Sequence, residues 1–317
     1  MNTAIRTAVV GTLSLLPFSA FACSSCGCTL GGDWESQGFS AQPGVRVELR
    51  YDYLNQSQLR SGTGTVDRGA ITLPNEREIE QGTVNRYTTL GIDYTPNADW
   101  GVNVQIPYID RTHGTIAEGD TATSSSHTGN LGDVRVIGRY QGLSAERNIG
   151  IQFGVKLPTG DFHQTFHAGP QAGEDLDRGL QPGSGTTDLM LGAFYTGALS
   201  DNWDYYTQGM VQGALDQREG YKPGTSLNLN AGVRYMAFDR YTPELQVNMR
   251  TVRRDSGINA DTENSGGTLV YLSPGVSVDV ASNLKAFGFV QVPVYQHVNG
   301  YQLTPRYTLS AGVRYQF

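Results

Sequence analysis

The chain has 317 residues, a formal net charge of −7 and 40 glycines, and only 17% of its residues are charged. The high glycine content and low charge argue against an ordinary soluble helical enzyme, and 17 tyrosines with 11 phenylalanines argue against a disordered chain. The acidic balance also gives no support for nucleic-acid binding.

The first 22 residues have the features of a secretory signal peptide. Arg6 supplies the positive charge, residues 8–18 are mostly apolar, and Ala20-Phe21-Ala22 fits the small-residue cleavage rule. The apolar run is too short to anchor a chain in a membrane. We therefore predict a signal peptide at 1–22 and a mature chain that starts at Cys23. The alternative is a lipoprotein acylated at Cys23, although Ala20 is not the aliphatic residue expected there.

All three cysteines, Cys23, Cys26 and Cys28, lie together at the predicted mature N-terminus. Gly27 stands where a c-type haem site needs histidine. In an oxidising periplasm the simplest expectation is a Cys23–Cys26 disulfide that leaves one thiol over. The alternative is a site where three thiolates bind Cu(I) or Zn(II). The segment 23–43 is expected to plug a barrel or to present the thiols to a periplasmic redox or metal partner.

From residue 44 onward the chain is a succession of alternating segments. The clearest is 45–53, where every odd position is apolar or aromatic and every even position is charged. This period of two marks a strand with one apolar and one charged face. We find about twelve such segments, most of them near the length of a tilted strand that crosses a bilayer. They lie near 44–54, 85–95, 100–110, 131–142, 147–157, 186–198, 203–214, 226–237, 242–252, 268–280, 284–295 and 306–317.

The connections between these segments alternate between short and long. Turn-forming residues such as 96–99 and 281–283 make the short ones. The long polar ones lie near 55–84, 111–130, 158–185, 215–225, 253–267 and, somewhat shorter, 296–305. This alternation predicts that 44–317 is an all-β, transmembrane, antiparallel up-and-down β-barrel of the bacterial outer membrane.

The alternative is a soluble barrel or sandwich that buries the apolar face. Three features favour the membrane: the signal peptide, a last strand that ends in Phe317, and tyrosines near the strand ends. A terminal aromatic residue on a last amphipathic strand resembles the recognition signal of outer-membrane barrels. The tyrosines are Tyr51, Tyr53, Tyr94, Tyr108, Tyr140, Tyr235 and Tyr315.

In a membrane barrel, the polar faces of the strands line the lumen. Charges of both signs then face one another, as a salt-bridged filling or as an arginine ladder that selects anions. The sequence leaves both interpretations open. The predicted lumen residues are Arg46, Glu48, Arg50, Asp52, Asp133, Arg135, Arg139, Arg234, Glu244, Arg250 and Arg314.

Three stretches carry a family resemblance: 131–134 (LGDV), 155–161 (VKLPTGD) and 183–192 (GSGTTDLMLG). Together with the strand layout, they resemble the outer-membrane barrels grouped as transporters of the meta-pathway of phenol degradation. The resemblance implies passage of aromatic or apolar compounds. The cysteine-rich N-terminus departs from that family.

The sequence offers little support for an enzyme. It has no Gly-x-Ser-x-Gly motif, and only His297 lies near a strand end. His163 and His167 would suit one metal ion if their loop is helical, but we expect a solvated loop tip. We predict a channel or transporter for a small solute, in contact with outer-membrane lipid. The second hypothesis is a barrel that anchors a metal or thiol-redox site at Cys23, Cys26 and Cys28.

Overall fold

A computed structural model describes residues 42–317. The predicted signal peptide and the cysteine segment lie almost entirely outside these residues, and both stay predictions. The described chain is β-structure with two short 3₁₀ turns, Arg68–Ala70 and Arg178–Leu180. Its strands are β1 Gly44–Gly62, β2 Gly64–Thr65, β3 Ile79–Thr95, β4 Trp100–Ile116, β5 Ser124–Leu131, β6 Arg135–Tyr140, β7 Ile149–Lys156, β8 Asp188–Ser200, β9 Trp203–Ala214, β10 Ser226–Tyr235, β11 Tyr241–Val252, β12 Gly267–Ala281 and β13 Leu284–Gln316.

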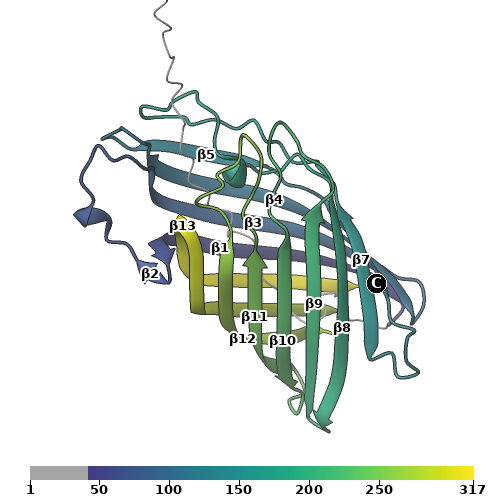
Figure 1. Cartoon of the computed structure of the whole chain (residues 1–317). Coiled ribbons are helices and arrows are strands. Elements are labelled where there is room, and N and C mark those ends of the chain that lie inside the picture. The colour runs from purple at the N-terminus through teal and green to yellow at the C-terminus, as the bar shows by residue number, and fades with distance from the viewer. Residues whose placement is uncertain (1–41) are drawn as a thin grey trace, which may run out of the picture.

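The strands close into a single antiparallel barrel (Figure 1). Neighbours in the sequence pair with each other around the ring, and β13 closes it by pairing with β1. Arg46 lies opposite Gln316 at one end of this seam, and Arg60 lies opposite Gln302 near the other. A closed ring leaves no unpaired sheet edge for the lipid to cover, which is what a membrane-spanning sheet needs.

The last two predicted segments lie within β13. Its residues 284–298 pair with β12, whereas its residues 298–316 pair with β1. Both pairings are antiparallel, so the chain reverses near Gly300, whose φ of +56° suits glycine. The ring therefore has eleven labelled strands with β2 and β5 outside it, and every predicted segment has a counterpart in it.

The apolar faces of the strands point outward and the polar faces point inward. Leu49, Tyr94, Val247 and Val313 are among many large apolar side chains exposed on the outer surface. The buried side chains are mostly polar or charged, and the apolar clusters inside are small. A soluble barrel would show the reverse, so the membrane interpretation of the alternation is confirmed.

Aromatic side chains gather near the end of the barrel that carries the short connections, which we call the turn end. Trp100 lies 4.7 Å from Tyr140, and Trp203 lies 4.9 Å from Tyr235, measured between ring centroids. Such rings are typical of the interface between lipid tails and water. We call the opposite end the loop end. Among residues 42–317, no helix has the length and apolar composition needed to cross a membrane.

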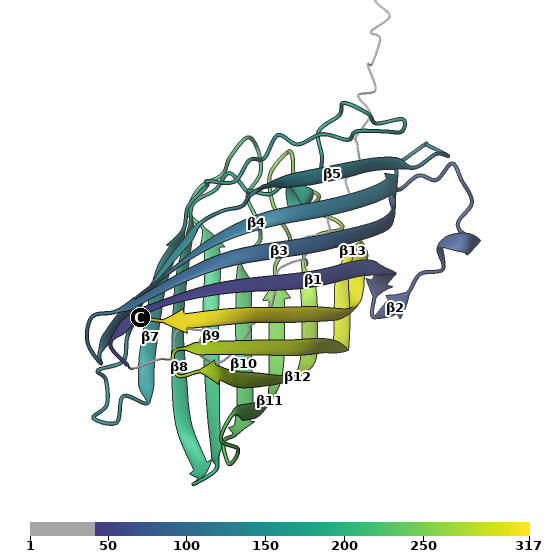
Figure 2. The ribbon, with the colours of Figure 1, turned by 180° about the vertical axis from the view of Figure 1, so that it is seen from behind.

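Several predicted loops are partly strand. β1, β3 and β4 continue to Gly62, Ile79 and Ile116, and β5 occupies part of the predicted loop 111–130. Figure 2 shows these strands extending together, at the loop end, past the ends of the other strands. Their outer parts carry no large exposed apolar side chains, so they stand beyond the lipid-facing belt. Alternation predicts strands only where one face meets lipid, which explains why these extensions were missed.

One position in the barrel wall is not a continuous ladder. β4 pairs with β5 toward the loop end and with β6 toward the turn end. β6 also pairs with β7, but β5 has only one isolated bridge on its other side, Ser125 to Ala168 in the long β7–β8 loop. Residues 132–134, between β5 and β6, therefore lie where strand pairing gives way to loop packing. We call this position the break in the wall.

Candidate functional site

Ion pairs fill the barrel near the turn end. The carboxylate of Asp93 accepts hydrogen bonds from Arg46 at 2.8 Å and from Arg139 at 2.5 Å. Both guanidinium groups also donate to Thr95 Oγ1. Both arginines and Asp93 are buried, so each charge depends on the others for compensation.

Further ion pairs lie on the inner surface, between neighbouring strands and within one strand. Arg314 donates to Glu48 at 2.5 Å, and Arg50 donates to Asp52 at 2.9 Å. The polar faces of the predicted segments thus point inward as expected. In this half the arrangement is that of a salt-bridged filling rather than a ladder of free arginines. Among the remaining predicted residues, Arg234 pairs with Asp204 at 2.9 Å, and Glu244 accepts from Ser277 at 2.9 Å.

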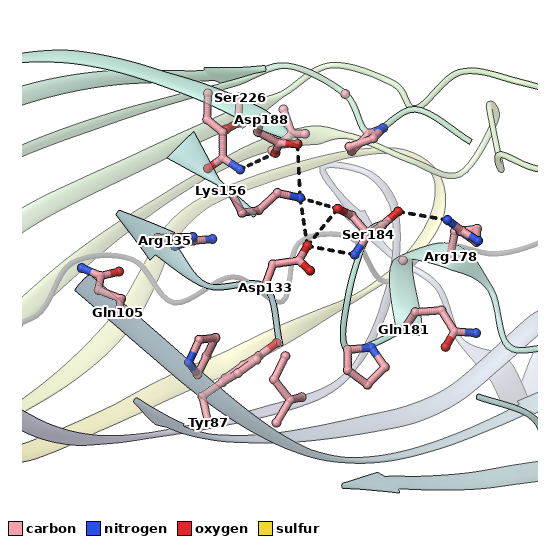
Figure 3. A pocket seen from close by; sticks show the side chains of 18 of the residues that line it. Tyr87, Gln105, Asp133, Arg135, Lys156, Arg178, Gln181, Ser184, Asp188 and Ser226 are labelled. Carbon is pink, nitrogen blue, oxygen red and sulfur yellow. Dashed lines mark hydrogen bonds and ion pairs between the residues drawn. The ribbon is translucent and has the colours of Figure 1, made fainter. Parts of the chain in front are cut away.

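The three stretches that carry the family resemblance meet at Asp133, between β5 and β6. Its carboxylate accepts hydrogen bonds from the backbone N–H groups of Gly160 and Ser184 at 3.1 and 3.0 Å. It also pairs with Lys156 Nζ at 3.0 Å, and Lys156 reaches Asp188 at 3.2 Å. We call these five residues the Asp133 cluster. It ties both ends of the β7–β8 loop to the break in the wall (Figure 3).

Glycines allow the backbone segments to approach closely beside this cluster. A Cβ on Gly183 would lie 2.3 Å from the carbonyl oxygen of Gly160, and a Cβ on Gly160 would lie 2.7 Å from Cα of Gly183 and 3.0 Å from the carbonyl carbon of Gly132. Any larger residue would push these segments apart. Thr159 Oγ1 adds a hydrogen bond to the carbonyl of Gly132 at 3.0 Å.

A cavity of about 220 Å³ lies inside the barrel next to the Asp133 cluster. Its wall combines charged side chains with apolar ones such as Ile109 and Val252. Gly179 and Pro182 of the long β7–β8 loop also line it, so this loop folds inward. Arg111 fixes the loop from β4 by donating to the carbonyl of Gly179 at 3.3 Å. The loop therefore narrows the lumen from the loop end.

Sequence reasoning identified part of this arrangement. The structure places Arg50, Arg135 and Arg250 on the cavity wall together with Asp133. The sequence analysis did not single out Asp93, Lys156 and Asp188, which are partners of the predicted charges. Each of the three lies on the polar face of a predicted segment, so the same alternation could have found them.

Buried carboxyl groups gather at the loop end, beyond the lipid-facing belt. Glu80 is fully buried; its Oε2 accepts from the backbone N–H of Leu303 at 3.0 Å, while its Oε1 has no hydrogen-bond partner within residues 42–317. Burial raises the pKa of Glu80 to about 8, and the negative charges of Glu78 and Asp261 add to the shift. Burial and neighbouring acids also hold the pKa of Asp177 well above its usual range.

The titration of Glu80 gives a testable pH dependence. Glu80 is protonated in the folded state up to about pH 8, whereas in the unfolded chain it ionises near its ordinary value of 4.5. The contribution of Glu80 to the free energy of unfolding is therefore greatest below pH 4.5, and it is lost as the pH rises from 4.5 toward 8. Glu80→Gln should change stability little at pH 4 and raise the free energy of unfolding at pH 9 by about 3–5 kcal/mol. Urea titrations at both pH values measure this, with exposed Glu76→Gln as the control; equal pH profiles for parent and E80Q would contradict the assignment.

His163 and His167 do not meet the condition for sharing a metal ion. Residues 163–167 are not helical, so the condition for that site is not met. Nδ1 of His167 accepts from the backbone N–H of His127 at 3.1 Å, and His163 lies 3.9 Å from Glu219. Within residues 42–317, no three or more His, Cys, Asp and Glu side chains are grouped to hold a metal ion.

Comparisons with known proteins agree with the barrel. No family model and no curated protein sequence matches the chain. An outer membrane channel from Pseudomonas putida F1 is similar in structure, with a TM-score of 0.62, 11% identity and coverage of 87% of this chain and 96% of that one. The translocator domain of the autotransporter NalP from Neisseria meningitidis has a TM-score of 0.51, with 10% identity and coverage of 89% and 92%. The CymD monoaromatic hydrocarbon channel has a TM-score of 0.46, with 10% identity and coverage of 96% and 98%.

The shared fold and the apolar outer belt define the class of protein. This chain is an outer-membrane β-barrel, as predicted from the alternation of its strands. Its outer surface contacts membrane lipid.

Proposed function

We propose that this barrel is a narrow outer-membrane channel for small solutes with aromatic or apolar bodies, and that it is not an enzyme. The observation that carries the proposal is the cavity of about 220 Å³ inside the barrel, walled partly by apolar side chains. Ion pairs fill the lumen on its turn-end side, and the inward loop covers it on the other. Such a lumen suits selective passage better than bulk diffusion.

The break in the wall offers a second route, directly between the cavity and the lipid. Leu131 and Leu157 flank the break and are exposed on the outer surface, so it lies within the lipid-facing belt. Loop segments at Gly132, Gly160 and Gly183 close it by close packing and a few hydrogen bonds, such as that from Thr159 Oγ1 to the carbonyl of Gly132, without a strand ladder between them. These segments can separate without breaking the barrel's strand pairing. An apolar solute could leave sideways there, and the resemblance to the meta-pathway transporters supports such cargo.

Two measurements test the proposal. In planar bilayers the folded protein should give small, stable ohmic steps, because the paired charges leave only a narrow aqueous path. Cells that make the barrel should take up radiolabelled toluene faster than cells without it, while large antibiotics remain excluded from both. Folded protein that gives neither conductance nor faster uptake would contradict a channel and favour a barrel that serves as an anchor.

The cysteine hypothesis stays a separate prediction, because Cys23, Cys26 and Cys28 lie outside the described residues. We propose that the channel function survives replacement of all three by serine. A thiol-redox or copper or zinc site that works with a periplasmic partner would not survive it. Toluene uptake by the triple variant distinguishes the two.

A further inference from the structure

The cavity next to the Asp133 cluster has an excess of positive charge. Six cationic and three acidic side chains line it. The acids are Asp133, Asp188 and Asp255. The first two share Lys156, and Asp255 accepts hydrogen bonds from Tyr221 and from the backbone N–H of Gly224. These carboxylates are therefore already engaged by the protein.

Three of the cations have no carboxylate partner within residues 42–317. Arg111 donates only to neutral oxygens, those of Asn85, Tyr87 and Gly179. Arg250 donates to Asn228 at 2.9 Å, and its Nε is buried without a hydrogen-bond partner in the described chain. Arg135 has no hydrogen bond or ion pair within the described chain, and Figure 3 shows none between it and the residues drawn around it.

Uncompensated guanidinium groups inside a barrel favour an anion. A charge removed from bulk water is costly unless an opposite charge meets it. The planar guanidinium fork matches the two oxygens of a carboxylate, and such charge-assisted hydrogen bonds are the strong ones. Arg111 is held in place by its three neutral partners. Arg135 and Arg250 keep donors available.

The remaining wall sets the body of the ligand. Pro107, Ile109, Pro182 and Val252 give the cavity an apolar part beside the arginines. Its volume of about 220 Å³ is small for a ligand pocket, so it suits a single ring or a short chain. A neutral hydrocarbon would leave the arginines without an opposite charge, and a sugar would make no apolar contact with the rest of the wall.

We propose that this cavity binds small organic carboxylates with an aromatic or apolar body, and that Arg135 and Arg250 bind the carboxylate. The proposal rests on the proposed channel function and names amphipathic anions as the solutes that the cavity prefers. It differs from a general anion ladder, because the other predicted lumen arginines near the turn end are paired with acids.

Calorimetric titration of the folded full-length mature barrel in detergent tests the proposal. Benzoate is the probe, and benzyl alcohol is its neutral counterpart of similar shape. We expect saturable benzoate binding, at least tenfold weaker binding of benzyl alcohol, and benzoate binding that persists in excess chloride. Equal affinity for both aromatic compounds, or complete displacement of benzoate by chloride, would overturn the proposal.

Variants locate the site. The double variant Arg135→Gln with Arg250→Gln should bind benzoate at least tenfold more weakly while keeping the thermal unfolding temperature of the parent. Arg234→Gln is the matched control, because Arg234 is also on the inner face but pairs with Asp204 and does not line the cavity. If the double variant binds benzoate as tightly as the parent, Arg135 and Arg250 do not bind the carboxylate. If toluene uptake and conductance persist but the preference for benzoate is absent, the channel function stands and only this inference fails.

Discussion

Asp93→Ala should be the most destabilising single substitution in the lumen that leaves the strand pairing intact. It removes the carboxylate that Arg46 and Arg139 share, and both guanidinium groups stay buried. Breaking a buried ion pair by deleting one partner typically costs about 3–5 kcal/mol. We expect a loss of that size in the free energy of unfolding, measured by urea titration of the protein in detergent.

The same substitution should change ion selectivity. Without this carboxylate, the buried guanidinium groups of Arg46 and Arg139 would make the lumen near the turn end more positive and would attract anions. The reversal potential across a planar bilayer in a salt gradient should therefore move toward that of the anion. Asp99→Ala is the control, because Asp99 forms an exposed pair with Arg147 at the turn end and should change stability by about 1 kcal/mol or less. An unchanged reversal potential in Asp93→Ala would mean that the ions do not pass these arginines.

The strands that face lipid could be predicted from the sequence for a simple physical reason. In segments such as 45–53, one face must be apolar and the other polar, so the pattern of residues records the membrane directly. β5 and the outer parts of β1 and β3 face water on one side and protein on the other. Serine, threonine and glycine serve both surroundings, so no alternation marks them.

The candidate site was harder to predict because its parts are distant in the sequence. Asp133, Gly160 and Ser184 come together only because β6, β7 and β8 are neighbours and the loop between β7 and β8 turns back to the wall. The family resemblance singled out all three stretches without indicating that they touch. Likewise, alternation places Arg46 and Arg135 on the same inner surface. Only the register of the strands shows that Arg46 meets Asp93 while Arg135 meets no carboxylate of the described chain.

Asp133→Ala should loosen the wall and open the channel. The carboxylate of Asp133 holds the backbone of Gly160 and Ser184, the hydroxyl of Ser184 and the ammonium of Lys156. Lys156 keeps Asp188 as a partner, so the loss is smaller than a complete loss of its charge compensation. Hydrogen bonds to charged groups contribute about 1.5–3 kcal/mol each, and they are not additive here. We expect a loss of about 2–4 kcal/mol in the free energy of unfolding.

Asp133→Ala should increase conductance and solute uptake even though it lowers stability. No strand ladder holds the loop segments at Gly160 and Gly183, and the carboxylate of Asp133 is their main polar anchor. Releasing this anchor should therefore increase conductance and speed toluene uptake. Asp161→Ala is the matched control: its carboxylate bonds only to the nearby backbone N–H of His163 and the side chain of Gln164, within the same loop. It should change neither conductance nor uptake. If Asp133→Ala is destabilised but conducts and takes up toluene like the parent, the cluster holds the fold together and the solute route lies elsewhere in the lumen.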